Sequence, residues 1–221
     1  MIRVILLLGI FGVFVQDSIA ESDPLKVTHA VLVHGIWQSE ARCFGFLRRD
    51  LEARGVEVIV PSLKPTDGRA GMALMAEQLK KEVNAAFGEE QEILLVGFSM
   101  GGLVARCYLQ DLGGADRCEA FVTISTPHHG TKMAKFHWGK GAAEMRPGSV
   151  FLKALQDSES RMGKMPIVSY RTPMDAIVVP ADSSVWGLAE NICIPCPLHP
   201  LMTFSPKLRK DLLKRFEFPA G

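Results

Sequence analysis

Short apolar runs alternate along this chain with longer segments in which the apolar residues recur at helical spacing. Runs such as HAVLV at 29–33 and ILLVG at 93–97 have no helical period, which is typical of strands buried on both faces of a parallel sheet. Further runs of this kind lie at 56–60, 121–124, 166–170 and 191–194. The pattern therefore predicts a sheet built from these strands.

Between the runs, apolar residues recur every three or four positions and predict helices. The clearest helix has one apolar stripe, formed by Met72, Met75, Ala76, Leu79, Val83, Ala86 and Phe87. Ser39 can cap an earlier helix that Gly55 ends, and Ser205 can open a final helix before Pro206. Strands and helices that alternate in this way indicate an α/β fold, with a mostly parallel sheet and helices on both faces.

Residues 126–150 interrupt this alternation. The segment contains four glycines, three histidines and Trp138, and a short helix is expected to follow it at 150–155. Sheets of this class bind ligands at the carboxyl ends of their strands. We therefore expect the segment to be an insertion that covers this edge of the sheet.

The N-terminus has the pattern of a secretory signal peptide. Arg3 precedes an uncharged apolar run from Val4 to Val15, and Ser18-Ile19-Ala20 supplies the small residues before a cleavage site. We expect residues 1–20 to be a signal peptide of an exported, periplasmic or secreted protein, and residues 21–221 to form a single domain. An uncleaved membrane anchor is the alternative, although the run is shorter than an ordinary membrane span.

Composition and charge exclude some classes of protein. A hydrophobic fraction of 48% with 22% charged residues is typical of a globular domain rather than a disordered chain. The net charge is +1 and no basic run stands out, so nucleic acid is not an expected partner.

Cys193 and Cys196 form a C-x-x-C motif without the second ligand pair of a zinc ribbon. We therefore expect these cysteines to have a packing role or to form one local disulfide bridge.

Candidate chemistry is concentrated at Gly97-Phe98-Ser99-Met100-Gly101, which fits the G-x-S-x-G motif. A strand that turns at once into a helix leaves no room for side chains around the turn, and it holds the residue at the apex in strained geometry. The motif lies between a predicted buried strand and an amphipathic helix. Ser99 is therefore predicted to be a nucleophile whose hydroxyl projects above the sheet edge, at the positive end of the helix.

A serine nucleophile needs a base to take its proton and a carboxylate to orient that base. His199 follows both Ser99 and a candidate acid, which gives the chain order Ser, Asp, His of this architecture. Asp175 follows its predicted strand most closely and is the preferred acid. The alternatives are Asp182, Glu190 and Asp157.

Acyl transfer also needs backbone donors for the oxyanion. Met100, directly after the nucleophile, can supply one N–H group, and Ile36 in the loop after the first strand can supply another. Gly35 allows the close approach that this requires. His34 is expected to support the loop rather than to transfer protons.

Several motifs together resemble the small α/β-hydrolase lipases and esterases of bacteria. They are VLVHGIW at 31–37, GFSMGG at 97–102, STPHHGT at 125–131, MDAIVVP at 174–180 and HPLM at 199–202. The single HG differs from the HGGG loop of hormone-sensitive-type esterases. No cluster of acidic residues matches the structural calcium site of the larger bacterial lipases, so the resemblance implies neither a metal nor a cofactor.

Carried over by position, the resemblance implies that Ser99 is the nucleophile, Asp175 the acid and His199 the base, with Ile36 and Met100 at the oxyanion hole. It also implies that the insertion after the HHGT segment shapes the acyl pocket or forms a small lid.

The leading hypothesis is a serine hydrolase that cleaves small-molecule or lipid carboxylic esters, with a transient contact to a lipid interface. Thioesterase, amidase and acyltransferase activities use the same groups and remain alternatives, and a non-catalytic binding protein with the hydrolase fold is a hypothesis of a different class. Candidates for the lining of an acyl site are Trp37, Phe136, Trp138, Val150, Phe151 and Trp186.

Overall fold

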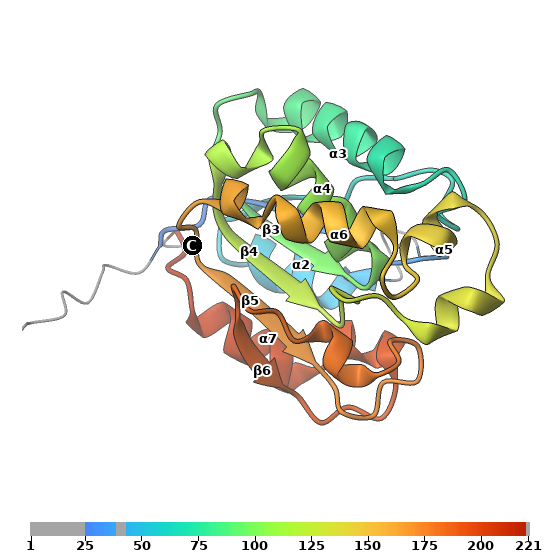
Figure 1. The fold of residues 1–221 in the computed structure, drawn as a ribbon. Coiled ribbons are helices and arrows are strands. Elements are labelled where there is room, and N and C mark those ends of the chain that lie inside the picture. Colours follow the sequence, from blue (N-terminus) through green and yellow to red (C-terminus); the bar gives the residue numbers. More distant parts are fainter. Residues whose placement is uncertain (1–24, 39–42, 220–221) are drawn as a thin grey trace, which may run out of the picture.

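A six-stranded, all-parallel sheet forms the centre of the computed structural model, which describes residues 25–38 and 43–219 (Figure 1). The strands lie in the order β2-β1-β3-β4-β5-β6, so that β3 and β4 occupy the middle. Their bounds are β1 His29–Val33, β2 Glu57–Ile59, β3 Ile93–Phe98, β4 Cys118–Ile124, β5 Ile167–Arg171 and β6 Glu190–Cys193. All the predicted strands are present, within one to three residues of the expected bounds.

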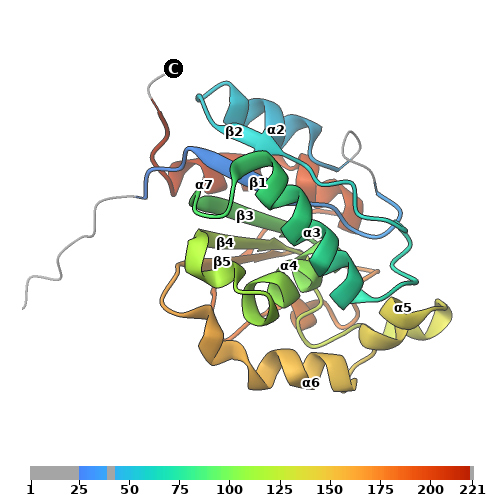
Figure 2. The same cartoon turned by 90° about the horizontal axis from the view of Figure 1, so that it is seen from above.

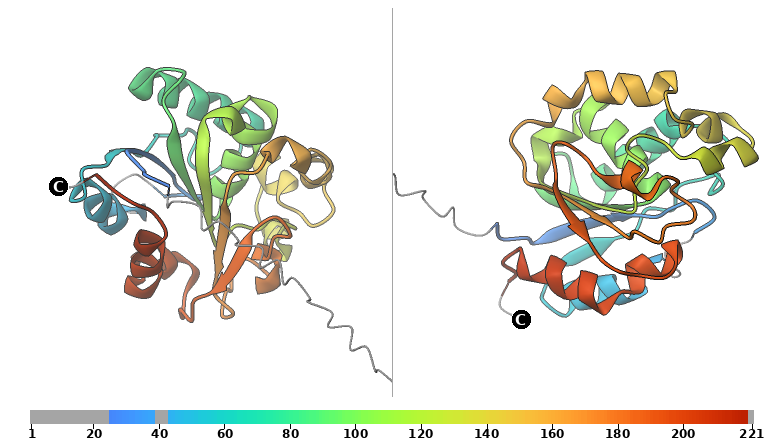
Figure 3. Two further views of the ribbon diagram at one scale, coloured as in Figure 1. Left: turned by 90° about the vertical axis from the view of Figure 1, so that its left-hand side faces the viewer. Right: turned by 60° about the horizontal axis from the view of Figure 1, so that its bottom comes forward.

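Helices cover both faces of the sheet, which confirms the predicted three-layer α/β architecture. The helix bounds are α2 Gly45–Glu52, α3 Met72–Phe87, α4 Met100–Asp111, α5 Lys140–Glu144, α6 Val150–Asp157 and α7 Pro206–Lys214. Figure 2 shows α3, α4 and α6 together on one side of the sheet, and Figure 3 shows α2 and α7 together on the other. Short 3-10 helices complete the fold, including η2 (Lys132–Phe136), η3 (Glu159–Met162) and η5 (His199–Phe204).

The two faces of the sheet enclose separate hydrophobic cores. In β1, Val31 and Val33 pack with α3 and α4, whereas Ala30 and Leu32 pack with α2 and α7. Alternate residues of a strand point to opposite faces, so an uninterrupted apolar run supplies both cores. This accounts for the apolar runs that identify the strands in the sequence.

Some expectations fall on residues that the structure does not describe. The predicted signal peptide at 1–20 and the predicted cap at Ser39 lie outside the described residues, and α2 begins at Gly45. The final helix does begin at Pro206, where the Ser205 hydroxyl accepts a hydrogen bond from the Leu208 N–H. Within residues 25–38 and 43–219, no helix is both long enough and apolar enough to cross a membrane.

The junction between β3 and α4 is packed backbone against backbone. A Cβ atom on Gly97 would lie 2.5 Å from Cα of Gly102. A Cβ on Gly102 would in turn collide with the side chain of Thr126, and one on Gly101 would collide with the backbone oxygen of Val33. These glycines let α4 start directly above the strands, where a side chain would push the helix away.

We expect Gly97→Ala to lower the free energy of unfolding by about 1–3 kcal/mol or more, because the new methyl group meets backbone atoms that cannot rotate away. The control is Gly45→Ala, at the start of α2, where a Cβ meets nothing within 4 Å. Alanine is the better helix former by about 0.5–1 kcal/mol, so this variant should be as stable as the parent or slightly more so. Urea unfolding of both variants tests the difference. Equal stabilities would contradict the packing argument.

Candidate active site

Ser99 occupies the sharp turn between β3 and α4. Its backbone lies at φ 53° and ψ −124°, a conformation that non-glycine residues rarely adopt, as the motif predicted. The neighbouring sheet holds it there, because its N–H donates a hydrogen bond to the Ile124 carbonyl at 2.8 Å. The next residue, Met100, is the first of α4, so the positive end of the helix lies beside the serine.

Asp175 and His199 are brought together from two loops. The Nδ1 atom of His199 lies 2.7 Å from Oδ2 of Asp175, and both side chains are buried. The other carboxylate oxygen accepts hydrogen bonds from the N–H groups of Ile177, at 2.9 Å, and Val178, at 2.8 Å. The carboxylate therefore fixes the orientation of the imidazole, and Nε2 is the nitrogen left for proton transfer.

The surroundings of Asp175 favour its ionised form. Burial alone would raise its pKa, but hydrogen bonding and charge attraction from His199, together with the two backbone N–H groups, lower the pKa below its ordinary value. An ionised carboxylate is the form that stabilises a protonated imidazole. The pair is therefore suited to orient a general base.

The other carboxylates considered as the acid lie elsewhere. Asp182 is exposed and forms an ion pair with Arg171 at 3.1 Å, and Glu190 forms an ion pair with Arg215. Asp157 is exposed at the end of α6. Of the four candidates, only Asp175 contacts His199 in the structure.

Ser99 and His199 line the same cavity, which has a volume of about 230 Å³. Its walls are largely apolar and come from the loop after β1, the η2 segment and the loop that carries Asp175. The lining includes Phe98, Pro127, Thr131, Met133, Ala134, Met145, Ile177, Val178 and Pro200. A small apolar cavity beside a serine and a histidine is suited to hold an acyl chain.

Ile36 and Met100, the predicted oxyanion residues, line this cavity as well. The Met100 N–H belongs to the first turn of α4, where backbone donors have no partner within the helix. A Cβ on Gly35 would lie 3.0 Å from the ring of Phe98 and 3.2 Å from Cβ of Ser99, so this loop approaches the elbow closely.

His34 is buried away from the cavity lining, and its Nδ1 lies 2.9 Å from the Gly35 carbonyl oxygen. It therefore lies where it can support the loop, as expected from the sequence.

The apolar candidates for the acyl site have different places in the structure. Trp37 lines the cavity. Phe136 and Trp138 line a neighbouring surface cleft instead, and Val150 is exposed. Phe151 is also not in the cavity wall, because it is half-buried against the hydrophobic core. Trp186 was the wrong choice, because it is 1% exposed and packs within the hydrophobic core beside α4. A tryptophan in a loop gives no sequence signal that distinguishes a core position from a pocket wall.

Thr131 has a structural role that the sequence did not indicate. Its hydroxyl donates a hydrogen bond to the Ile177 carbonyl at 2.7 Å and accepts one from the Val179 N–H at 3.0 Å. These bonds fasten the loop that carries Asp175 to the insertion after β4. The only signal was its place at the end of the STPHHGT motif.

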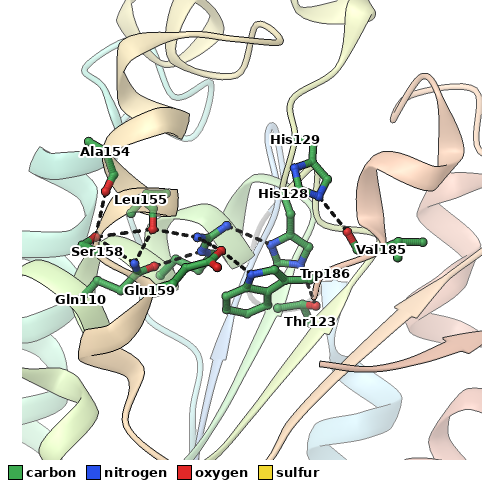
Figure 4. A network of polar contacts seen from close by, with 11 residues as sticks. Gln110, Thr123, His128, His129, Ala154, Leu155, Ser158, Glu159, Val185 and Trp186 are labelled. Carbon is green, nitrogen blue, oxygen red and sulfur yellow. Dashed lines mark hydrogen bonds and ion pairs between the residues drawn. The ribbon is translucent and has the colours of Figure 1, made fainter. Parts of the chain in front are cut away.

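A largely buried polar network lies beside the loop after β4 (Figure 4). The Arg106 guanidinium on α4 forms an ion pair with Glu159 at 3.0 Å and lies over the Trp186 ring, 4.3 Å from its centroid. The indole N–H of Trp186 donates to the same carboxylate at 2.6 Å. His128 stacks on Trp186 with ring centroids 4.5 Å apart, and its Nε2 lies 3.1 Å from the Thr123 hydroxyl. The network joins α4, η3 and the loop after β4.

Burial affects other titratable groups near the core. It raises the pKa of the Cys43, Cys107 and Cys118 thiols to about 12, so these thiols are not activated nucleophiles. All five cysteines are free, and the local bridge between Cys193 and Cys196 is not formed. Among the described residues, no group of three or more His, Cys, Asp or Glu side chains could hold a metal ion.

Stability should depend on pH through His128. Burial, and then the charge of Arg106, hold its pKa well below 6.5, so the native state keeps it neutral while the unfolded chain takes up a proton below about pH 6.5. Stability should therefore fall as the pH drops, by about 1.4 kcal/mol between pH 7.5 and 5.5 from this group. Urea unfolding at both pH values should show that His128→Gln loses less stability on acidification than the parent. An equal loss would contradict the assignment, whatever the overall stability of the variant.

A family model described as palmitoyl protein thioesterase matches residues 30–163, which is more than half of the chain. This match includes Ile36 and Ser99 but ends before Asp175 and His199. A search of the curated proteins found no match.

Solved structures share the fold at low sequence identity. The mature lipase BlEst2 of Bacillus licheniformis aligns with a TM-score of 0.66 at 17% identity, over 86% of this chain and 90% of that one. Lipase B of Aspergillus fumigatus aligns with a TM-score of 0.64 at 17% identity, over 76% of this chain and 44% of that one. A pyrethroid hydrolase of Sphingobium faniae aligns with a TM-score of 0.58 at 17% identity, over 85% of this chain and 96% of that one. These likenesses identify the α/β-hydrolase fold.

Proposed function

Because this chain belongs to the palmitoyl protein thioesterase family, within the α/β-hydrolase fold, we propose that it is a serine hydrolase that cleaves carboxylic oxyesters and thioesters. One observation carries the proposal. A serine at a strained strand-to-helix turn shares an apolar cavity with a histidine whose other ring nitrogen is bound to a buried carboxylate. Each of these features is needed for acyl transfer, and a simple binding site requires none of them.

The proposed reaction proceeds through an acyl-enzyme. Nε2 of His199 takes the proton of the Ser99 hydroxyl as Oγ attacks the carbonyl carbon, and the Ile36 and Met100 N–H groups stabilise the resulting oxyanion. The protonated imidazole, held by Asp175, then gives its proton to the departing alcohol or thiol. His199 next activates a water molecule, which releases the carboxylic acid and restores the serine.

The cavity limits the acyl group. At about 30 Å³ for each heavy atom, the share of a water molecule in the liquid, 230 Å³ holds about eight carbon atoms. The cavity is also smaller than the ~300–1,000 Å³ of typical sites for drug-sized ligands. We therefore propose a medium-length acyl chain of about eight carbons, with any longer chain extending out of the cavity.

Export remains part of the proposal. It rests on the charged, apolar and small-residue pattern of residues 1–20, and the mature enzyme would then consist of residues 21–221. An uncleaved anchor would instead place the same domain at a membrane surface.

The first test is hydrolysis of p-nitrophenyl esters from acetate to palmitate, beside octanoyl oxyester and thioester pairs. We expect the highest kcat/KM near octanoate and a loss of about 10³-fold or more in Ser99→Ala, which lacks the nucleophile. A fluorophosphonate probe should label the parent and leave Ser99→Ala unlabelled. A maximum at palmitate would contradict the proposed chain length alone. Absence of both labelling and turnover in folded protein would favour the binding-protein hypothesis.

The second test concerns the acid. Asp175→Asn should lower kcat by about 10³- to 10⁴-fold, because the amide no longer favours the productive tautomer or stabilises the imidazolium. Asp182→Asn is the matched control, since this exposed side chain pairs with Arg171 and should leave kcat within about twofold. Equal losses in the two variants, measured on the same ester, would overturn the assignment of Asp175.

A further inference from the structure

Basic and aromatic side chains gather in the insertion after β4, between residues 132 and 140, which we call the docking segment. Figures 1 and 2 show this part of the chain, with α5 at its end, projecting from the body of the molecule. It contains Phe136, which is 62% exposed, and Trp138, which is 91% exposed, more than any other large hydrophobic side chain among the described residues. Such exposure of a tryptophan is unfavourable in water and marks an interaction surface.

Backbone contacts anchor the chain directly after Trp138. The neighbouring Gly139 has φ 96° and approaches the main chain of Arg69 so closely that a Cβ would lie 2.8 Å from its Cα atom. On the far side of this contact, the Lys140 N–H donates to the Arg69 carbonyl at 3.0 Å, and the Gly141 N–H donates to the Gly68 carbonyl at 3.2 Å. These contacts anchor the segment on the body of the protein, while the indole points away from it.

The charge of this region is strongly positive. Residues 132–153 contain five basic residues and one acidic residue, a net charge of +4, whereas the whole chain has a net charge of +1. The one acidic residue, Glu144, is largely buried; it accepts a hydrogen bond from the Met72 N–H at 2.7 Å and forms an ion pair with Lys140 at 3.9 Å. Lys135 lies over the ring of Phe136, with Nζ 4.8 Å from the centroid, so cationic and aromatic groups share one surface. This surface therefore attracts negatively charged partners.

The docking segment also lies at the entrance to the catalytic cavity. Phe136 and Trp138 line a surface cleft of about 450 Å³ that shares Ile36, Trp37 and His137 with the wall of that cavity. The rings of Trp37 and His137, 4.9 Å apart, stand where the cleft meets the cavity. An acyl chain that leaves a lipid surface in contact with Trp138 would reach Ser99 through this cleft.

We propose that the docking segment binds the enzyme to an anionic lipid surface, with Trp138 and Phe136 inserted at the headgroup level and the lysines facing the lipid charges. Tryptophan is favoured at such interfaces because its ring is amphipathic, and basic residues are attracted to anionic headgroups. If the proposed function holds, the substrate reaches the active site from this lipid surface. Only this consequence rests on the proposed function, since binding to the lipid surface does not require Ser99.

The test is co-sedimentation of the Ser99→Ala protein with phosphatidylcholine vesicles that contain zero to 40% phosphatidylglycerol. We expect binding that rises with the anionic fraction and weakens with salt. Lys135→Gln should weaken it by about fivefold, the factor that corresponds to ~1 kcal/mol for a basic residue near the surface. Lys140→Gln should weaken it less, because Glu144 already pairs with this lysine at 3.9 Å. Trp138→Ser should weaken binding severalfold, whereas Trp138→Phe should retain most of it.

Tryptophan fluorescence supplies an independent readout. In the Ser99→Ala protein that also carries Trp37→Phe, a blue shift should occur on addition of anionic vesicles and be much smaller when Trp138→Phe is added, because the remaining Trp186 is 1% exposed and does not contact lipid. Leu74→Ser, a half-exposed position on α3, is the matched control and should bind as the parent does.

Several results would overturn the proposal. One is the absence of vesicle binding, which is the result expected if the segment binds an acidic protein instead. The others are equal binding to neutral and anionic vesicles, and vesicle binding that is unchanged in Trp138→Ser. Because these measurements use a variant without the nucleophile, their outcome is separate from that of the ester hydrolysis experiments.

Discussion

Close contact between β3 and the start of α4 is the constraint on which the rest of the structure depends. Gly97, Gly101 and Gly102 remove the side chains that would separate the helix from the strands, and this forces the chain to reverse at Ser99. The positive φ at Ser99 costs about 1–3 kcal/mol, which the surrounding packing must offset. The conformation persists because α4 is buried along almost its whole length and because the Ile124 carbonyl holds the Ser99 N–H. This packing and hydrogen bonding therefore keep the serine in the strained turn at the edge of the sheet.

The remaining groups reach that edge because all the strands are parallel. The carboxyl ends of β1, β3, β4, β5 and β6 lie at one edge, so the loops after them converge although they are far apart in the sequence. Side-chain bonds then fix the loops. Asp175 accepts hydrogen bonds from two backbone N–H groups of its own loop. The network of Arg106, Glu159 and Trp186 contacts the loop after β4 through the stacking of Trp186 on His128. The polar groups of this network satisfy one another, which makes their burial tolerable.

The sequence predicted the sheet, the main helices and the position of Ser99 because these depend on local periodicity and on glycine spacing. It also favoured Asp175 and His199 through chain order, and the structure brings these two side chains into contact. It could not separate a core position from a pocket wall, as Trp186 shows, since both environments select large apolar side chains. The roles of Thr131 and Arg106 were missed as well, because hydrogen bonds between residues 46 or more positions apart leave no periodic signal.

Residues 126–140 illustrate how one insertion can meet several demands on the same edge of the sheet. Its first part is buried, where His128 stacks on Trp186 and Thr131 fastens the loop of Asp175. Its middle part supplies Met133 and Ala134 to the cavity wall. Its last part contacts Arg69 through Gly139 and carries Trp138, which is 91% exposed. An exposed aromatic surface lowers solubility unless charge keeps molecules apart. The lysines on either side of Trp138 supply that positive charge. The same charge would attract the segment to an anionic lipid surface, where the indole would be buried away from water.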